Sequence, residues 1–237
     1  MSDPRSPLPI GINSLQTIID NGMAYVDKTA FAWELARLPG RYFLSRPRRF
    51  GKSLFVDTLK ELFEGNEALF RGLSVHDRWE WSRRFPVIKL DFASGVLDSR
   101  EALDRRIYSL LQENAERLGI DDAPEQDIAG AFGKLIRQAH EQSGQQVAIL
   151  VDEYDKPILD NIDHLEPAAA VREGLKNLYS TMKAQDAHIH QDFPRETSPF
   201  RAGRDSGRRG SPPGGDCLSA AFLGNITTVS YSRPTAG

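Results

Sequence analysis

The sequence predicts an α/β fold in which a parallel sheet carries helices on both faces. Segments of strand length at 41–45, 86–92 and 147–151 alternate with longer segments of helical periodicity. The run 147–151 is apolar throughout, which is typical of a central parallel strand that is covered on both sides. Strands that alternate with helices favour a parallel sheet joined by right-handed crossovers.

The helices between these strands are predicted from apolar residues that recur every three or four positions. Residues 8–30 form a lead-in with an extended piece at 24–26. A helix after the first strand carries Leu54, Leu59 and Leu62 on one face and ends at Gly65. Three further helices are expected at 99–118, 125–142 and 168–184.

Composition places the chain in the soluble globular class. Of 237 residues, 40% are hydrophobic and 27% charged, and the net charge of −3 gives no global signal for nucleic acid. Cys217 is the only cysteine, so no intrachain disulfide can form. No secretory signal and no run of ~20 apolar residues is present. The expected location is the cytoplasm, without membrane association.

The character of the chain changes near residue 188. From His188 to Gly237 there is no lysine, and Gly, Pro, Ser and Arg crowd residues 194–215. This composition is typical of disorder, although 226–231 has the propensity of a strand. The predicted organisation is therefore a domain at 1–187, with its lead-in at 1–40, and a disordered or non-native tail at 188–237. The sheet is expected to be incomplete.

The turn between the first strand and its helix has the features of a phosphate-binding P-loop. Amides at the start of a helix point at an anion, and the helix dipole favours negative charge there. Gly51 lets the backbone approach phosphates, Lys52 reaches the β- and γ-phosphates, and the Ser53 hydroxyl binds Mg²⁺. Arg46 stands where the usual pattern has its first glycine, so a plain loop with a solvated lysine is the alternative. The predicted nucleotide-binding residues are Arg46, Pro47, Arg48, Arg49, Phe50, Gly51, Lys52, Ser53 and Leu54.

Two acids directly follow the apolar run 147–151. Asp152, at the carboxyl end of a buried strand, can hold Mg²⁺ together with Ser53, and Glu153 can polarise the attacking water as a general base. Asp91 ends the preceding strand and is expected to lie near them, where it could tune Glu153. The predicted catalytic residues are therefore Glu153, Lys52 and Asp91. The alternative is that these acids only terminate strands.

Several segments together resemble the predicted AAA-ATPase-like family. They are PIG (9–11), YVDKT (25–29), FLSRPRRFGKS (43–53), VIKLDF (87–92), DEYDKPI (152–158) and LKNLYS (175–180). The resemblance runs from about residue 8 to about 187, and in that family Arg46 is the ordinary form of the loop. It implies a P-loop NTPase of the additional-strand type, often fused to a C-terminal restriction-endonuclease-like nuclease domain. Neither that domain nor the family's sensor strand is recognisable after residue 187.

The sequence thus predicts an ATP-binding protein, with ATP and Mg²⁺ as cofactors, that couples hydrolysis to a conformational change on an unknown partner. A nucleic-acid or protein partner and an oligomer both stay open. The alternatives are a binding module without hydrolysis and a truncated or frameshifted fragment. Weaker candidates are Arg172 as an arginine finger, Tyr25 and Phe31 beside an adenine, and His188 with His190 as a metal pair. Core packing is favoured for the aromatic pair, and the histidines lack a third ligand.

Overall fold

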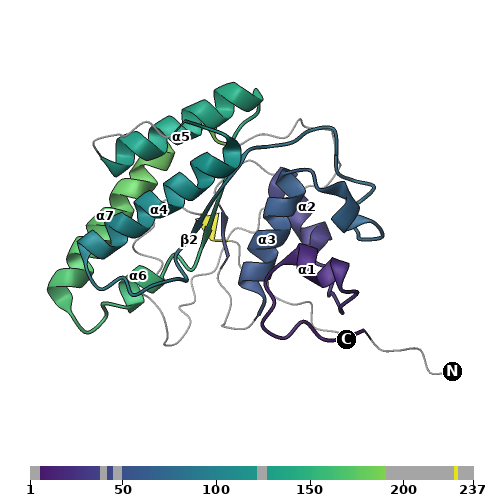
Figure 1. Cartoon of the computed structure of the whole chain (residues 1–237), viewed down its shortest axis with the longest axis horizontal. Coiled ribbons are helices and arrows are strands. Elements are labelled where there is room, and N and C mark those ends of the chain that lie inside the picture. The colour runs from purple at the N-terminus through teal and green to yellow at the C-terminus, as the bar shows by residue number, and fades with distance from the viewer. Residues whose placement is uncertain (1–5, 38–41, 45–49, 122–126, 191–226, 229–237) are drawn as a thin grey trace, which may run out of the picture.

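The computed structural model describes residues 6–37, 42–44, 50–121, 127–190 and 227–228. Helices predominate, and short parallel strands lie between them (Figure 1). The elements in chain order are α1 (Leu15–Asp20), α2 (Thr29–Arg37), β1 (Tyr42–Phe43), α3 (Lys52–Phe63), η1 (Glu67–Phe70), β2 (Val87–Asp91), α4 (Arg100–Leu118), α5 (Ile128–Ser143), β3 (Ala148–Asp152), α6 (Lys156–Leu159), α7 (Leu165–Ala184), η2 (Asp186–His188) and β4 (Thr227–Thr228).

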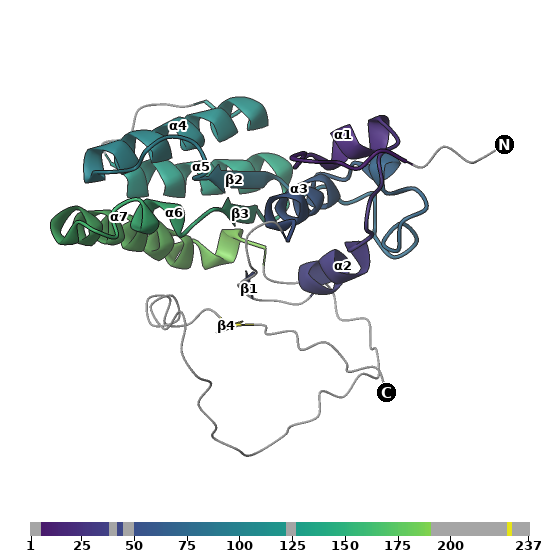
Figure 2. The ribbon, with the colours of Figure 1, turned by 90° about the horizontal axis from the view of Figure 1, so that it is seen from below.

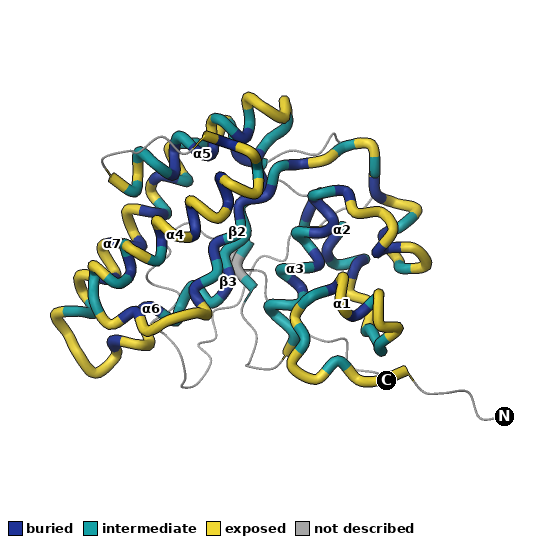
Figure 3. Tube along the Cα trace, in the orientation of Figure 1, coloured by how far each residue is buried: buried dark blue, intermediate teal, exposed yellow. Residues whose placement is uncertain are grey.

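The pair β2–β3 forms the centre of the domain. The two strands are parallel and in continuous register from Val87 opposite Ala148 to Asp91 opposite Asp152. Because side chains alternate across a strand, each of these strands contributes to a core on both faces. The dark-blue segments in Figure 3 show this burial along β2 and in the helices on both sides.

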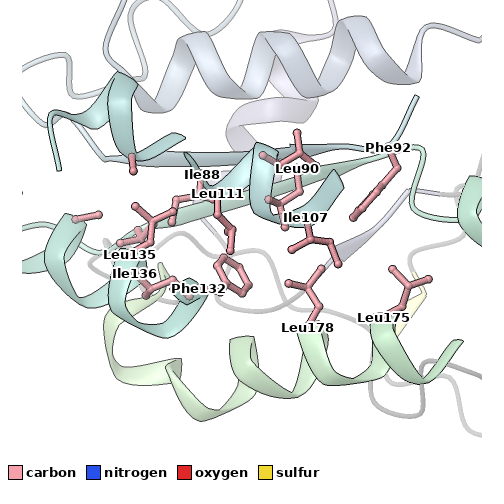
Figure 4. Close-up of a cluster of buried hydrophobic side chains, with 14 of the residues drawn as sticks. Ile88, Leu90, Phe92, Ile107, Leu111, Phe132, Leu135, Ile136, Leu175 and Leu178 are labelled. Carbon is pink, nitrogen blue, oxygen red and sulfur yellow. The ribbon is translucent and has the colours of Figure 1, made fainter. Parts of the chain in front are cut away.

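One face of the strand pair is covered by α4, α5 and α7. Ile88 and Leu90 from β2 point into this layer and are fully buried there. Figure 4 shows them facing side chains of all three helices. The helical members of this core include Ile107, Leu111, Phe132, Leu135, Ile136, Leu175 and Leu178. The apolar faces of these three helices thus lie in the core, as their helical periodicity predicted.

The opposite face is covered by α1, α2 and α3. Val87 and Ala148 point to this side, where they pack with Leu15, Phe55 and Leu62. Figure 2 shows α1, α2 and α3 grouped apart from α4, α5 and α7. The coarse prediction of an α/β protein with parallel strands between helical layers is therefore confirmed.

The ends of the helices agree with local capping chemistry. The Ser99 side chain accepts a hydrogen bond from the Ala102 N–H at the start of α4, and Asp127 caps Gly130 in the same way at the start of α5. The expected helix 125–142 therefore begins at Ile128. The last helix is longer than expected, because α7 begins at Leu165 rather than at 168.

The packed domain continues past the predicted boundary at residue 187. Ile189 forms a parallel bridge with Val147 at the start of β3, on the edge not used by β2, and only 8% of its surface is exposed. Its neighbour His190 packs edge-to-face against Phe63 and Phe85 at centroid distances of 5.4 and 4.9 Å. Of the predicted tail, residues 191–226 and 229–237 lie outside the described part, so the expected disorder there stays a prediction.

The two remaining strands pair with each other. Tyr42 and Phe43 of β1 lie in parallel register with Thr227 and Thr228 of β4, the only described part of the expected strand 226–231. Residues 24–26, expected to be extended, belong to no strand of the described chain. In the described residues, no helix combines the length and the apolar character needed to cross a bilayer.

Candidate phosphate and metal site

The amino end of α3 is the first component of the candidate site. Gly51 precedes Lys52, the first helical residue, and has φ 73° and ψ 33°, a left-handed conformation that costs glycine little. Its carbonyl accepts the first helical bond from the Phe55 N–H at 3.0 Å. The first amides of a helix have no intrahelical partner, so this end can receive an anion.

The predicted loop residues divide into described and undescribed ones. Phe50 is 56% exposed, and Gly51, Lys52, Ser53 and Leu54 are half-buried. Arg46, Pro47, Arg48 and Arg49 lie outside the described residues, so their predicted nucleotide contacts stay predictions.

The direction of α3 brings its amino end toward the carboxyl ends of β2 and β3. The last residue of the helix, Phe63, accepts a hydrogen bond at 2.8 Å from Phe85, just before β2, and the helix packs against both strands. A 12-residue helix is about 18 Å long, close to the roughly 16 Å of a five-residue strand. Because α3 ends beside the residue that precedes β2 and has nearly the same length as that strand, we expect its amino end near the carboxyl end of β2.

Asp91 and Asp152 lie at that end of the strands as register partners. Asp152 is only 4% exposed, and its Oδ1 accepts a hydrogen bond from the Glu153 N–H at 3.0 Å. Asp91 is more open: its Oδ1 accepts from the Ala93 N–H at 2.9 Å, and its Oδ2 lies 4.0 Å from Lys89 Nζ. The expectation that Asp91 lies beside Asp152 is confirmed, while the roles of both residues stay predictions.

Glu153 has an unusual backbone. Its φ is 50°, and in the described residues it is the only residue other than glycine with positive φ. This region costs a residue with a Cβ roughly 1–2 kcal/mol. Such strain persists where the surrounding structure enforces it, and it often marks functional positions. Glu153, whose role as a general base stays a prediction, thus follows the buried Asp152 on a strained turn.

The loops that leave β2 and β3 are tied to each other. Lys156 Nζ donates to the Gly95 carbonyl at 2.6 Å, and Asp160 Oδ2 accepts from the Leu97 N–H at 3.2 Å. The amide of Asn161, which is 1% exposed, donates to the Leu97 carbonyl at 2.6 Å. These three bonds connect the segment after Asp91 with the segment after Glu153, so the turns that carry the two acids are braced.

The two residues predicted to hold Mg²⁺ are of a chemical type that this ion accepts. Mg²⁺ usually takes one or two carboxylates, water and substrate phosphates rather than a complete protein cage. The shared metal role of Ser53 and Asp152 stays a prediction. The described residues contain no group of three or more His, Cys, Asp or Glu side chains arranged to hold a metal.

The weaker sequence candidates have structural roles. Tyr25 Oη lies 3.3 Å from Thr58 Oγ1, and burial raises the pKa of Tyr25. Phe31 packs on Phe55 with ring centroids 5.7 Å apart, so both aromatic residues pack against α3. His190 packs on aromatic rings as described above, and its Nε2 lies 3.1 Å from the Ala36 carbonyl. Arg172 lies on the exposed side of α7.

One basic residue near the loop was not among the predicted site residues. Lys28 Nζ lies 3.4 Å from the carbonyl oxygen of Phe50, although 22 residues separate them in the chain. The sequence carried a signal for it, because Lys28 belongs to the YVDKT segment that takes part in the family resemblance. The sequence of that segment alone does not predict that Lys28 lies beside the start of α3.

Fold and site together define an α/β protein with parallel strands, a glycine-led helix start and acidic residues at the strand ends. The chain belongs to the AAA-ATPase_like family, described as predicted AAA-ATPases, whose sequence profile matches residues 9–201. It is 54% identical over 186 residues to a protein of Azotobacter chroococcum mcd 1 named "Uncharacterized protein in vnfD 5'region". That alignment covers 78% of this chain but only 36% of the relative. No solved structure matches the chain.

Proposed function

We propose that the chain is the P-loop domain of an additional-strand ATPase and that it binds ATP together with Mg²⁺. The observation that carries the proposal is the direction of α3, which ends beside the residue that precedes β2. We infer from it that the glycine-led start of α3 lies at the end of β2 and β3 that carries Asp91, Asp152 and Glu153. Family membership supports the same reading. The strand pairing is compatible with it, because β1 pairs with β4, and β3 with β2 and Ile189.

Each residue has a chemical role in this proposal. Lys52 and the first amides of α3 bind the phosphate chain, while Ser53 and Asp152 hold the metal. Bound Mg²⁺ neutralises phosphate charge as it develops during transfer. Glu153 accepts a proton from a water that attacks the γ-phosphorus, and the bond between that phosphorus and the bridging oxygen breaks to leave ADP and phosphate. Asp91, beside Asp152, adjusts the electrostatics of Glu153.

The output of hydrolysis would be a conformational change passed to a partner. The chain spans about 36% of the length of its Azotobacter relative, so the partner surface can lie outside the region that the two share. A module that binds nucleotide without hydrolysing it is the second candidate. It is favoured by one observation: among the described residues, the second edge of β3 is paired only at Val147.

The test of binding is Lys52→Ala, with Lys176→Ala as a matched control on the exposed face of α7. Loss of a charge-assisted phosphate contact should weaken Mg-ATP binding about tenfold or more, because such a bond contributes about 1.5–3 kcal/mol. Isothermal titration calorimetry measures both variants against the parent. Equal affinities in the parent and Lys52→Ala would exclude a P-loop lysine. Turnover of ATP by the parent separates the ATPase from the binding module.

A further inference from the structure

Asp27 fixes the chain just before α2. Its Oδ1 accepts hydrogen bonds from the N–H and the Oγ1 of Thr29 at 2.8 and 2.6 Å, and its Oδ2 accepts from the N–H and the Oγ of Ser74 at 2.8 and 2.7 Å. Burial alone would raise the pKa of Asp27, but these four bonds outweigh it and lower that pKa. Thr29, fully buried, also accepts from the Val75 N–H at 3.2 Å. The backbone around Lys28 is therefore anchored to the segment after η1.

This anchoring directs Lys28 to the start of α3. Its Nζ lies 3.4 Å from the Phe50 carbonyl and 3.6 Å from the point that a Cβ on Gly51 would occupy. Both oxygens of the adjacent Asp27 are already bonded to Thr29 and Ser74, and within the described residues no carboxylate pairs with Lys28. A distance of 3.4 Å is long for an N–H···O bond, so the carbonyl holds the ammonium weakly.

We propose that Lys28 is a second phosphate-binding lysine, which contacts the phosphate chain of the nucleotide beside the glycine-led start of α3. This inference rests on the proposed function, because it names a further residue of that same site. The Lys28 ammonium thus lies directly beside the glycine that lets a phosphate approach the loop. A bound polyphosphate supplies the anionic partner that this ammonium lacks among the described residues, and a lysine acts there as a compact charge with three donors. The segment before α2 thereby becomes part of the nucleotide site.

The competing explanation is that Lys28 only clamps the loop through the Phe50 carbonyl. The two explanations predict different effects of salt on nucleotide affinity. A direct ammonium–phosphate contact is screened, so the affinity ratio of parent to Lys28→Gln falls as ionic strength rises. A clamp that shapes the loop leaves that ratio unchanged. The variant Lys28→Arg keeps the positive charge and should therefore retain most of the affinity that Lys28→Gln loses.

The experiment measures the affinity of the parent, Lys28→Gln, Lys28→Arg and the control Lys176→Gln for Mg-ATP and for inorganic triphosphate. Calorimetry is run at two salt concentrations, and the melting temperature without ligand is recorded for each protein. We expect Lys28→Gln to bind both ligands about tenfold more weakly, since a hydrogen bond to a charged group contributes about that factor. Lys28→Arg and Lys176→Gln should stay close to the parent.

The outcomes separate this inference from the proposed function. If the parent and Lys28→Gln bind equally well while Lys52→Ala binds about tenfold or more weakly, Lys28 is not a phosphate ligand, although the P-loop stands. A ratio that does not respond to salt, or a failure of Lys28→Arg to restore binding, also overturns the inference. If the parent binds neither ligand, the proposed function falls and the inference falls with it. A lowered melting temperature in Lys28→Gln shifts the decision to Lys28→Arg and the salt dependence.

Discussion

Asp91 and Asp152 are register partners at the carboxyl ends of two adjacent parallel strands, yet their surroundings differ. The Asp152 residue is 4% exposed and bonded to the next backbone N–H, whereas the Asp91 side chain is 35% exposed and lies near the Lys89 ammonium. A buried carboxylate with one oxygen occupied has one oxygen left for a metal or its water. The Asp91 carboxylate is instead partly exposed and lies at the edge of ion-pair distance from Lys89. The proposed roles of the two residues, metal ligand for Asp152 and neighbour of Glu153 for Asp91, correspond to this difference.

This difference predicts unequal effects of the same substitution. Asp152→Asn should remove most of the Mg²⁺ dependence of ATP binding, because an amide is a much weaker ligand for this ion than a carboxylate. Asp91→Asn should leave Mg²⁺ dependence intact and change only turnover, by less than the metal-ligand variant does. ATP affinity measured with and without Mg²⁺ checks both expectations. A larger loss of Mg²⁺ dependence in Asp91→Asn would reverse the assignment.

The strained turn predicts that Glu153 contributes to activity at the expense of stability. Glu153→Gly should relieve the left-handed strain of roughly 1–2 kcal/mol, minus the extra backbone entropy of glycine of about 0.5–1 kcal/mol. The net gain of up to about 1.5 kcal/mol corresponds to a rise of up to about 3–6 °C in melting temperature for a chain of this size. The same variant should not turn over ATP.

Glu153→Gln is the matched control for that variant. It keeps the Cβ and the strain, so its melting temperature should equal that of the parent, but it lacks the base. It should bind Mg-ATP normally and hydrolyse it much more slowly, which single-turnover kinetics measures. Unchanged turnover in Glu153→Gln would remove Glu153 from the mechanism, and a lower melting temperature in Glu153→Gly would show that the side chain has a structural role.

The sequence was sufficient for the parts of the fold that depend on periodic apolar residues. The strand that ends at Asp152 and the helix after Gly51 were predictable because a continuous apolar run and helical spacing are local features of the sequence. The meeting of Asp91 with Asp152 was predictable because parallel strands end at the same edge. In contrast, the positive φ of Glu153 and the reach of Lys28 to Phe50 depend on contacts between distant segments. Ile189 was assigned to the tail because composition changes there, but its packing on Val147 depends on the core already being formed.

An alkaline prediction follows from Tyr154, the residue after Glu153. Burial, then the charges of Asp155 and Glu153, raise its pKa from 10.0 to about 12. The folded state therefore keeps the phenol proton up to about pH 12, while the unfolded chain loses it near 10. Folding stability should fall as pH rises from 10 to 12, because only the unfolded state is then stabilised by deprotonation.

Tyr154→Phe should reduce the slope of that loss. Urea unfolding at a series of pH values measures the slope, and comparing slopes rather than absolute stabilities removes any effect of the missing hydroxyl at neutral pH. Part of the slope should persist, because burial also raises the pKa of Tyr179. An identical slope in the parent and Tyr154→Phe would mean that this phenol titrates normally in the folded protein.

Two helical glycines offer a matched test of how α7 packs against its neighbours. A Cβ on Gly174 of α7 would lie 2.9 Å from Leu103 Cδ2 and 3.0 Å from Arg100 Nε in α4. Leu103 is fully buried, so its Cδ2 cannot move aside at little cost. Overpacking of this kind typically costs about 1–3 kcal/mol, more than the roughly 1 kcal/mol that alanine gains over glycine in a helix.

Gly133 in α5 differs from Gly174 in the atoms that an added Cβ would meet. A Cβ there would meet the ends of two long side chains, Arg137 Nη1 and Gln185 Nε2, both at 3.3 Å, and these can move aside. Gly133→Ala should therefore be neutral or stabilising by up to about 1 kcal/mol, whereas Gly174→Ala should destabilise the domain. The free energy of unfolding from urea titration distinguishes the two. If Gly174→Ala is as stable as Gly133→Ala, α7 does not approach α4 closely at Gly174. The helical layer on this face of β2 would then be packed more loosely around Leu103 than the structure shows.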